Sequence, residues 1–276
     1  MILELKESAC TSCGKCAADC PAMIISMDGG KPCISPDNEA NCFDCHHCMA
    51  VCPEGAITIN GAKPENSITL DGYNPETADL GLLVQARRSC RNFKQENVDS
   101  ALIDKLIDLS AYAPTGRNAV SVSFTVIDRL EDMAKFTDAA KSVLKMIQNN
   151  RSLPEQASFF YDYIAAWTDM GVNTFFRNAP HILVLSAPKS IVTPETDCVI
   201  AGGYFELLAH ANGLGAYWNG LATYTISALA PELKKWLGIP EDHVIGYVLS
   251  FGYPAVEYAR TAQRKPKSVN RVRFNP

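Results

Sequence analysis

Eight of the eleven cysteines lie in two short runs that share one spacing. The first run reads CTSCGKCAADCP and the second reads CFDCHHCMAVCP, and each ends in a proline. Their thiols are those of Cys10, Cys13, Cys16 and Cys20 in the first run and Cys42, Cys45, Cys48 and Cys52 in the second. Thiols gathered this closely can form disulfides or bind metal, and in a reducing compartment clustered cysteines more often bind metal.

The spacing of the two runs decides among the alternatives, which are a disulfide scaffold, a pair of zinc sites and iron–sulfur clusters. Structural zinc sites favour two C-x-x-C pairs separated by a long loop, whereas each run here sets three cysteines at intervals of three. That spacing is typical of [4Fe–4S] clusters, because a short loop wraps three thiolates around one cluster while the fourth cysteine, before a proline, reaches the other cluster. The rule predicts one cluster on Cys10, Cys13, Cys16 and Cys52 and a second on Cys42, Cys45, Cys48 and Cys20.

The two copies of this motif make residues 1–62 resemble a bacterial two-cluster ferredoxin. Apolar residues follow each cluster loop, Ile24 and Ile25 after the first and Ile57 and Ile59 after the second. We expect them to form short strands that shield the clusters from water, which affects their reduction potentials.

The composition is compatible with reduced thiols inside a cell. The 276 residues have a formal charge of −5 and are 47% hydrophobic, which suits a soluble chain of one or two domains. We find no secretory leader after Met1 and no apolar run near the ~18 residues of a membrane span, so we expect a cytoplasmic protein without a membrane partner. Residues 1–64 hold eight acidic and four basic side chains, and the chain lacks the basic footprint of a nucleic-acid-binding protein.

A polar stretch rich in proline and glycine separates the cysteine runs from the rest of the chain, and we place a linker at 63–78. Beyond it, apolar residues recur at intervals of four and three from Val98 to Leu109, which predicts a helix that ends before Pro114. Strands are expected at 122–128, 181–187 and 244–252, and further helices at 130–149, 156–177, 197–213 and 227–237. Residues 79–276 should therefore form an α+β domain in which helices cover a central sheet.

Four segments of this domain set polar residues among apolar ones. They are RRSCRNF (87–93), YAPTGRN (112–118), the glycine-rich turn GLGAYWNG (213–220) and FGYPAVEYARTAQRKP (251–266). Arginine forks and hydroxyls suit a phosphate, although an arginine pair alone is more simply a solvated surface. In this order the segments resemble the FMN-binding nitroreductase family over about residues 80–276, which implies a central mixed or antiparallel sheet flanked by helices.

The second resemblance implies an FMN site at a homodimer interface. Its residues would be Arg87, Arg88, Ser89 and Arg91 at the phosphate and the polar ring edge, Arg264 at the phosphate, Thr115 and Asn118 along the ring, and the backbone amides of Asn219 and Gly220 at N5. The chain departs from the family at Ala119–Val122, where members often continue with Gln-Pro-Trp. No catalytic side chain is assigned, because nitro groups and quinones can draw protons from water.

Together the two resemblances imply an oxidoreductase that depends on FMN and iron–sulfur clusters. Electrons from an external one-electron donor such as ferredoxin or flavodoxin would pass through the clusters to FMN, which would reduce a nitroaromatic, a quinone or an activated alkene by hydride transfer. Two alternatives stay open. One is another flavin reaction on this scaffold, such as reductive dehalogenation or ene reduction, and the other is an electron carrier or adaptor for a partner protein.

An aromatic segment at 154–178 could belong to the core or to the flavin site. Its residues Phe159, Tyr163, Trp167 and Phe175 would share one face of the expected helix. Core packing is the simpler interpretation, and a cover over the flavin is the alternative. Cys90 and Cys198 are single thiols, and we expect them to be buried and structural.

Overall fold

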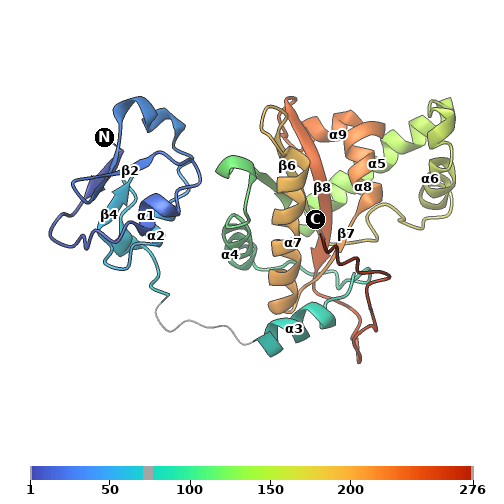
Figure 1. Ribbon diagram of the computed structural model, residues 1–276. Helices are drawn as coiled ribbons and strands as arrows, with labels where there is room; N and C mark the ends of the chain where they lie inside the picture. Colours follow the sequence, from blue (N-terminus) through green and yellow to red (C-terminus); the bar gives the residue numbers. More distant parts are fainter. Residues whose placement is uncertain (1, 71–76, 275–276) are drawn as a thin grey trace. The chain divides into compact units, whose positions relative to one another are not determined.

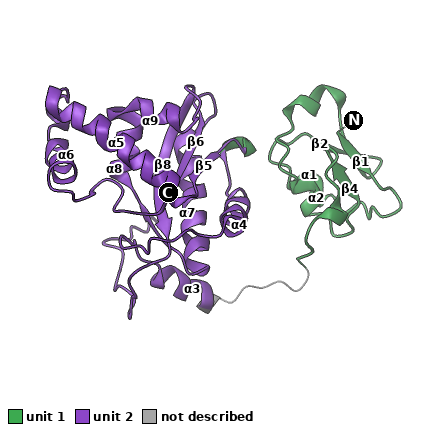
Figure 2. Cartoon of the chain, turned by 180° about the vertical axis from the view of Figure 1, so that it is seen from behind, with its two compact units in different colours: residues 1–75, 116–119 green, residues 76–115, 120–276 purple. Residues whose placement is uncertain are grey.

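The computed structural model describes residues 2–70 and 77–274, and these divide into two compact units. Of the described residues, the first unit comprises 2–70 together with Gly116–Ala119, and the second comprises 77–115 and 120–274 (Figures 1 and 2). The expected linker at 63–78 lies partly outside the described residues. Its described part contains one 3-10 turn, η2 (Pro64–Asn66).

The first unit is built from short elements around the two cysteine runs. Its antiparallel pairs are β1 (Leu3–Leu5) with β4 (Ile57–Ile59) and β2 (Ile25–Asp28) with β3 (Lys31–Ile34), and its helices are α1 (Lys15–Ala18), α2 (His47–Ala50) and the 3-10 helix η1 (Pro36–Asn41). The four predicted isoleucines are buried, in or next to β2 and β4, and pack with Cys16 and Cys48. The core of this unit therefore includes the thiols themselves.

The two cysteine runs share their backbone conformation as well as their sequence spacing. Equivalent residues of the two runs adopt the left-handed conformation, with φ of 59° at Ser12 and 51° at Asp44, and 72° at Gly14 and 57° at His46. A one-turn helix, α1 or α2, begins directly after the second of these positions. Left-handed backbone is unfavourable for most residues, so this shared geometry points to a common demand of the two loops.

The second unit has a four-stranded antiparallel sheet in the order β5-β6-β8-β7. The strands are β5 (Ser123–Ile127), β6 (His181–Pro188), β7 (Gly215–Trp218) and β8 (His243–Gly252). The helices are α3 (Thr77–Ala86), α4 (Ser100–Ser110), α5 (Leu130–Asn150), α6 (Phe160–Thr168), α7 (Pro194–Ala211), α8 (Gly220–Tyr224) and α9 (Pro231–Trp236), with short 3-10 turns η3 (Gly116–Asn118) and η4 (Glu155–Ala157) and the π-turn η5 (Thr225–Leu229). The predicted α+β class with an antiparallel sheet is confirmed.

Helices cover both faces of this sheet, as Figure 1 shows for α7 on one side and α5 and α8 on the other. Alternate residues of β6 serve the two cores, because Ile182 and Val184 pack with α5 and α6 while Leu183 and Leu185 pack with α4 and α7. Because this central strand is buried on both faces, residues 182–185 form a continuous apolar run, which explains why the sequence predicted a strand without alternation. No helix within residues 2–70 and 77–274 is long and apolar enough to cross a membrane.

Two expected elements differ from the structure. The helix predicted at 156–177 is shorter, since α6 ends at Thr168 and the chain turns at Gly171 with φ of +74°. Phe175 therefore lies beyond the helix, buried beside Trp167 in the core. Phe159 and Tyr163 are 55% and 40% exposed, so core packing holds for only two of the four aromatic residues. The glycine-rich turn predicted at 213–220 contains the edge strand β7.

The two single cysteines of the second unit are buried and pack against glycines. A Cβ on Gly246 would lie 2.2 Å from the Cβ of Cys198, and one on Gly215 would lie 2.6 Å from the Cβ of Cys90. Burial raises the pKa of the Cys198 thiol to about 12 and also raises the pKa of Cys90. The expectation that both are buried is confirmed.

His181 at the start of β6 is fully buried, and only one of its ring nitrogens is bonded. Its Nε2 accepts a hydrogen bond from the Val98 N–H at 3.0 Å, whereas Nδ1 has no partner in the described part of the chain. Burial lowers the pKa of His181 below its ordinary value of 6.5. The folded chain therefore holds this imidazole neutral at pH values where the unfolded chain protonates it.

This difference predicts a loss of stability in mild acid. The free energy of unfolding should be steady above about pH 6.5 and should fall below it by up to ~1.4 kcal/mol per pH unit, because only the unfolded state takes up the proton. Urea unfolding followed by tryptophan fluorescence measures this, since all three tryptophans lie in the second unit. A His181→Gln variant should lose this part of the slope, and an unchanged slope would contradict the assignment.

Candidate functional site

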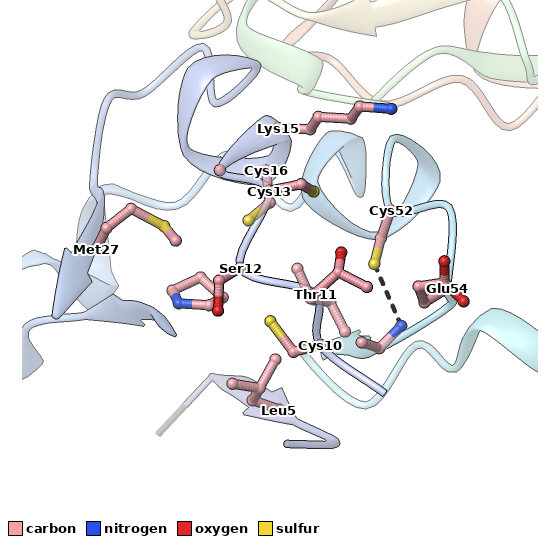
Figure 3. Close-up of a pocket in the computed structure, with 14 residues that line it drawn as sticks. Leu5, Cys10, Thr11, Ser12, Cys13, Lys15, Cys16, Met27, Cys52 and Glu54 are labelled. Carbon is pink, nitrogen blue, oxygen red and sulfur yellow. Dashed lines mark hydrogen bonds between the residues drawn. The ribbon is translucent and has the colours of Figure 1, made fainter. Parts of the chain in front are cut away.

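The first unit contains a cavity lined by cysteines from both runs. Cys10, Cys13 and Cys16 approach it from the first loop and Cys52 from the second, as Figure 3 shows. The unfilled space measures about 340 Å³, and apolar residues such as Leu5, Met27 and Ile57 complete its wall. The Cys52 Sγ accepts a hydrogen bond from the Ala56 N–H at 3.3 Å, which fixes its direction.

A second cavity of about 330 Å³ gathers the other four thiols. Its cysteines are Cys42, Cys45 and Cys48 from the second run and Cys20 from the first. Ile24, Ile34 and Ile59 line it, and Asn60 Nδ2 lies 3.9 Å from the Cys42 Sγ. The structure thus brings together the same two sets of four cysteines that the spacing predicted.

The donor chemistry of both cavities fits an iron–sulfur cluster. Each offers four thiols and a mostly apolar wall, and soft thiolate ligands of this kind select iron–sulfur clusters or zinc. All eleven cysteines are free thiols, so neither run forms the disulfide scaffold considered above. In the described residues, we find no group of three cysteine, histidine or acidic side chains arranged around a single metal ion.

The second unit holds a pocket with a cationic lining at the end of α3. Four basic side chains converge on it, Arg87 and Arg88 after α3 and Arg264 and Lys265 from the C-terminal segment. The two pairs are 177 residues apart in the chain and meet at one place in the fold. Guanidinium groups in such a pocket are suited to phosphate.

Arg87 is held by a buried acid that the sequence analysis did not single out. Its Nη1 donates to Glu206 Oε1 at 2.8 Å, and Trp218 Nε1 donates to Glu206 Oε2 at 3.0 Å. Glu206 lies on α7 and is only 7% exposed. Because a buried carboxylate needs a partner, Glu206 fixes the guanidinium of Arg87 next to the last residue of β7.

The segment after α3 runs beside β7. Ser89 forms a parallel bridge with Ala216, and the Cys90 N–H donates to the Ala216 carbonyl at 3.0 Å. The guanidinium of Arg91 lies 5.5 Å from the ring centroid of Tyr217. This pairing carries the predicted arginine and serine residues along the strand that ends at Asn219.

Asn219 is buried where β7 meets α8, and its polar groups serve the fold. Its N–H donates to the Val248 carbonyl at 2.8 Å, and its side-chain amide donates to the Phe175 carbonyl at 2.8 Å and to Ser250 Oγ at 2.9 Å. The N–H of Gly220 belongs to the first turn of α8, where a helix provides no acceptor. Of the two backbone donors predicted for N5, Asn219 is therefore engaged in the sheet and Gly220 is the better placed.

The structure does not bring Thr115 to the arginine pocket. Its Oγ1 accepts a hydrogen bond from the Val120 N–H at 3.0 Å, and it lines a small separate cavity with residues of α4, β5 and α7. Asn118 belongs to the first unit, where its Nδ2 donates to the carbonyls of Phe43 and Asp44, each at 3.1 Å. Within the second unit, the flavin residues predicted on the ring side and on the phosphate side thus lie apart.

Comparison with known proteins agrees with both units. Residues 84–253, well over half of the chain, match the nitroreductase family, and residues 9–57 match the 4Fe-4S dicluster domain. A candidate NADH dehydrogenase/NAD(P)H nitroreductase of Methanothermobacter thermautotrophicus is 26% identical over 177 residues, which are 62% of this chain and 75% of that protein. One of Archaeoglobus fulgidus is 24% identical over 70% of this chain and 97% of its own length.

Solved structures show the same fold for the second unit. The nitroreductase of Bacteroides fragilis with bound FMN superimposes with a TM-score of 0.58 at 17% identity, covering 71% of this chain and 99% of its own. The FMN-bound nitroreductase of Desulfitobacterium hafniense gives a TM-score of 0.54 at 22% identity with the same coverage. Both resemblances seen in the sequence are confirmed. The chain belongs to the nitroreductase family and carries a two-cluster 4Fe-4S domain ahead of its nitroreductase domain.

Proposed function

We propose that this chain is a reductase that draws electrons from an external one-electron donor through its two clusters and delivers them to a small organic acceptor at FMN. The observation that carries the proposal is the joining, in one chain, of two cavities lined by four thiols each to a nitroreductase domain. Nitroaromatics, quinones and activated alkenes are the acceptor classes. The donor is a low-potential protein such as ferredoxin or flavodoxin, and the free thiols support a cytoplasmic location.

Each cysteine is assigned to a cluster by the cavity that it lines, not by the run to which it belongs. The cluster of the first cavity, called the first cluster below, is held by Cys10, Cys13, Cys16 and Cys52. The cluster of the second cavity, called the second cluster, is held by Cys42, Cys45, Cys48 and Cys20. The four thiols that line each cavity, three from one run and one from the other, support this crossed arrangement.

The arginine pocket is the phosphate end of the FMN site. Arg88, Arg264 and Lys265 neutralise the phosphate, while Glu206 orients Arg87, and Ser89 and Arg91 continue the site along β7. The Gly220 N–H faces N5 of the ring. Bound FMN can hold two electrons and transfer a hydride, and the clusters exchange one electron at a time. The chain's own residues bind and orient these groups, and none is assigned as an acid or base.

A second copy of the chain completes the flavin site. Thr115 and the arginines are separated within one unit, so in a homodimer Thr115 and Asn118 would line the ring of the FMN held by the partner copy. Exposed apolar side chains support a dimer, since Leu80, Leu82 and Val84 of α3 are 51–60% exposed and Tyr204 of α7 is 41% exposed. Apolar surface of this extent on a soluble chain marks a protein interface.

One alternative has specific support, and a second belongs to another class of protein. The names of the archaeal relatives include NADH and NAD(P)H, so a nicotinamide could reduce the flavin directly. The clusters would then carry electrons away from the flavin. The other alternative is an electron carrier that passes electrons to a partner protein and converts no small molecule. Reductive dehalogenation and ene reduction remain variants of the proposed reaction.

The crossed ligands give a direct prediction. Cys52→Ser should remove the first cluster and leave an electron paramagnetic resonance spectrum like that of Cys10→Ser, because both thiols face one cavity. Cys20→Ser should match Cys42→Ser for the same reason. Each variant should lose close to half of the roughly eight iron atoms of two clusters. Spectra that instead group Cys52 with Cys42 would contradict the crossing.

The phosphate pocket predicts a loss of flavin affinity that depends on the phosphate. Arg88→Gln and Arg264→Gln should each weaken FMN binding by roughly tenfold or more, since a hydrogen bond to a charged group contributes about 1.5–3 kcal/mol. Quenching of flavin fluorescence measures the affinity. Riboflavin, which lacks the phosphate, should bind each variant as it binds the intact chain. Lys135→Gln on α5, which makes the same change of charge, is the control. A loss of riboflavin affinity as large as the loss of FMN affinity would show that these arginines do not bind the phosphate.

The route of the electrons is tested by anaerobic titration. Dithionite should bleach the cluster absorbance and then the flavin, and a nitroaromatic, a quinone or an activated alkene should reoxidise the reduced protein. NADH should bleach the flavin far more slowly. If NADH reduces the flavin equally fast in the intact chain and in a Cys10→Ser/Cys42→Ser variant, the nicotinamide alternative holds. If no small acceptor reoxidises the flavin, the carrier alternative holds.

A further inference from the structure

The two cysteine loops match in backbone but differ in charge. Aligning the runs sets Ser12 opposite Asp44, Gly14 opposite His46 and Lys15 opposite His47. The first two pairs share left-handed backbone, and α1 and α2 begin at the third pair. The number of thiols and the backbone of the loops are alike in the two cavities, whereas the charged side chains around them differ.

A lysine ammonium is fixed against the loop of the first cavity. Lys31, at the start of β3, is half-buried, and its Nζ donates to the carbonyl of Cys10 at 3.1 Å and to that of Glu7 at 3.4 Å. The charge is therefore held on the backbone of a cluster ligand. Lys15 also lines this cavity, but in Figure 3 its ammonium group points away from the sulfurs. Glu54, on an exposed stretch of the wall, is the acidic residue that lines the same cavity.

The second cavity has a carboxylate in its loop instead. Asp44 accepts from Asn60 Nδ2 at 2.7 Å, and the same Asn60 nitrogen approaches the Cys42 Sγ. His46 pairs with Asp44 at 3.3 Å and His47 with Asp19 at 3.1 Å, so a carboxylate lies in contact with each imidazole. No lysine or arginine of the described residues lines this cavity.

Arg117 lies near the second cavity without lining it. Its guanidinium lies 5.3 Å from the centroid of the Phe43 ring, which lines the cavity, and Arg117 itself does not. Arg117 is exposed to solvent, whereas Lys31 is half-buried. Salt and water screen an exposed charge more than a half-buried one.

These charges act on the reduction potential of each cluster. A [4Fe–4S] cluster that accepts one electron gains one negative charge, so a nearby cation favours the reduced form and a nearby carboxylate disfavours it. Hydrogen bonds and net charge around the sulfurs are recognised determinants of this potential. Lys31 should therefore raise the potential of the first cluster, and Asp44 should lower that of the second.

We infer that Lys31 makes the first cluster the higher-potential centre of the pair, so that a single electron entering the ferredoxin unit resides on the cluster of Cys10, Cys13, Cys16 and Cys52. This inference rests on the ligand sets of the proposed function. It gives the duplicated unit a direction, because an electron received by the second cluster moves to the first.

The test is a redox titration of the intact, cluster-loaded protein with dithionite, followed by electron paramagnetic resonance. In Lys31→Gln, the oxidised-to-reduced ratio of the higher-potential cluster at a fixed ambient potential should rise threefold to tenfold. This corresponds to a shift of about 28 to 59 mV to lower potential, since tenfold in a one-electron couple is 59 mV. Asp44→Asn should shift only the lower-potential cluster, and to higher potential.

Matched variants separate charge from structure. Lys31→Arg keeps the charge and should retain the wild-type potentials, whereas Lys135→Gln on α5 makes the same change of net charge in the other unit and should shift neither. The signal that Lys31→Gln shifts should be the one that Cys10→Ser abolishes. Unshifted potentials, equal shifts of both clusters or a shift of the lower-potential cluster would overturn the inference.

Iron analysis distinguishes this failure from a failure of the ligand sets. A protein with roughly eight iron atoms and unshifted potentials in Lys31→Gln refutes the role of Lys31 alone. A protein without two clusters, or one in which Cys10→Ser and Cys52→Ser affect different signals, refutes the crossed ligand sets and the inference with them.

Discussion

The exchange of one cysteine between the two runs is the constraint on which the first unit depends. Cys20 leaves its own loop for the second cavity and Cys52 leaves its loop for the first. The unit otherwise has two-stranded sheets and four-residue helices, a core too small to be stable by itself in most proteins. Each shared cavity brings together cysteines that are more than twenty positions apart, so cluster binding there would couple to the folding of this unit.

The second unit depends on a different constraint, the termination of β7 at its sheet edge. Asn219 bonds to β8 through its N–H and to Phe175 and Ser250 through its side chain, so the turn into α8 is rigid. The same edge carries Ser89 and Arg91 by pairing with Ala216 and packing on Tyr217. A rigid edge of this kind holds ligand-binding groups in register with the sheet while the helices cover its two faces.

Features that are encoded by residue spacing or periodicity could be predicted from the sequence. Features that depend on contacts between residues far apart in the chain could not. Cysteine spacing predicted both cavities, including the exchange of Cys20 and Cys52, because ligand geometry limits how the chain can wrap a cluster. Strand β6 was predicted because burial on two faces leaves a continuous apolar run, whereas β5 and β8 were predicted from their apolar and β-branched residues. Glu206 was not predicted, because its burial is explained by its ion pair with Arg87, which lies 119 residues earlier. The early end of α6 was not predicted, because the aromatic periodicity of the sequence continues past the glycine at which the chain turns.

The packing of the single cysteines against glycines divides the sulfur chemistry of the chain between its two units. Cys90 and Cys198 are sealed against Gly215 and Gly246, and burial keeps both thiols protonated at neutral pH. Iron and oxidants react with thiolates rather than with buried thiols. Eight thiols of the first unit instead line its two cavities. Metal loading is therefore directed to that unit, and loss of the metal would leave the packing of the nitroreductase domain intact.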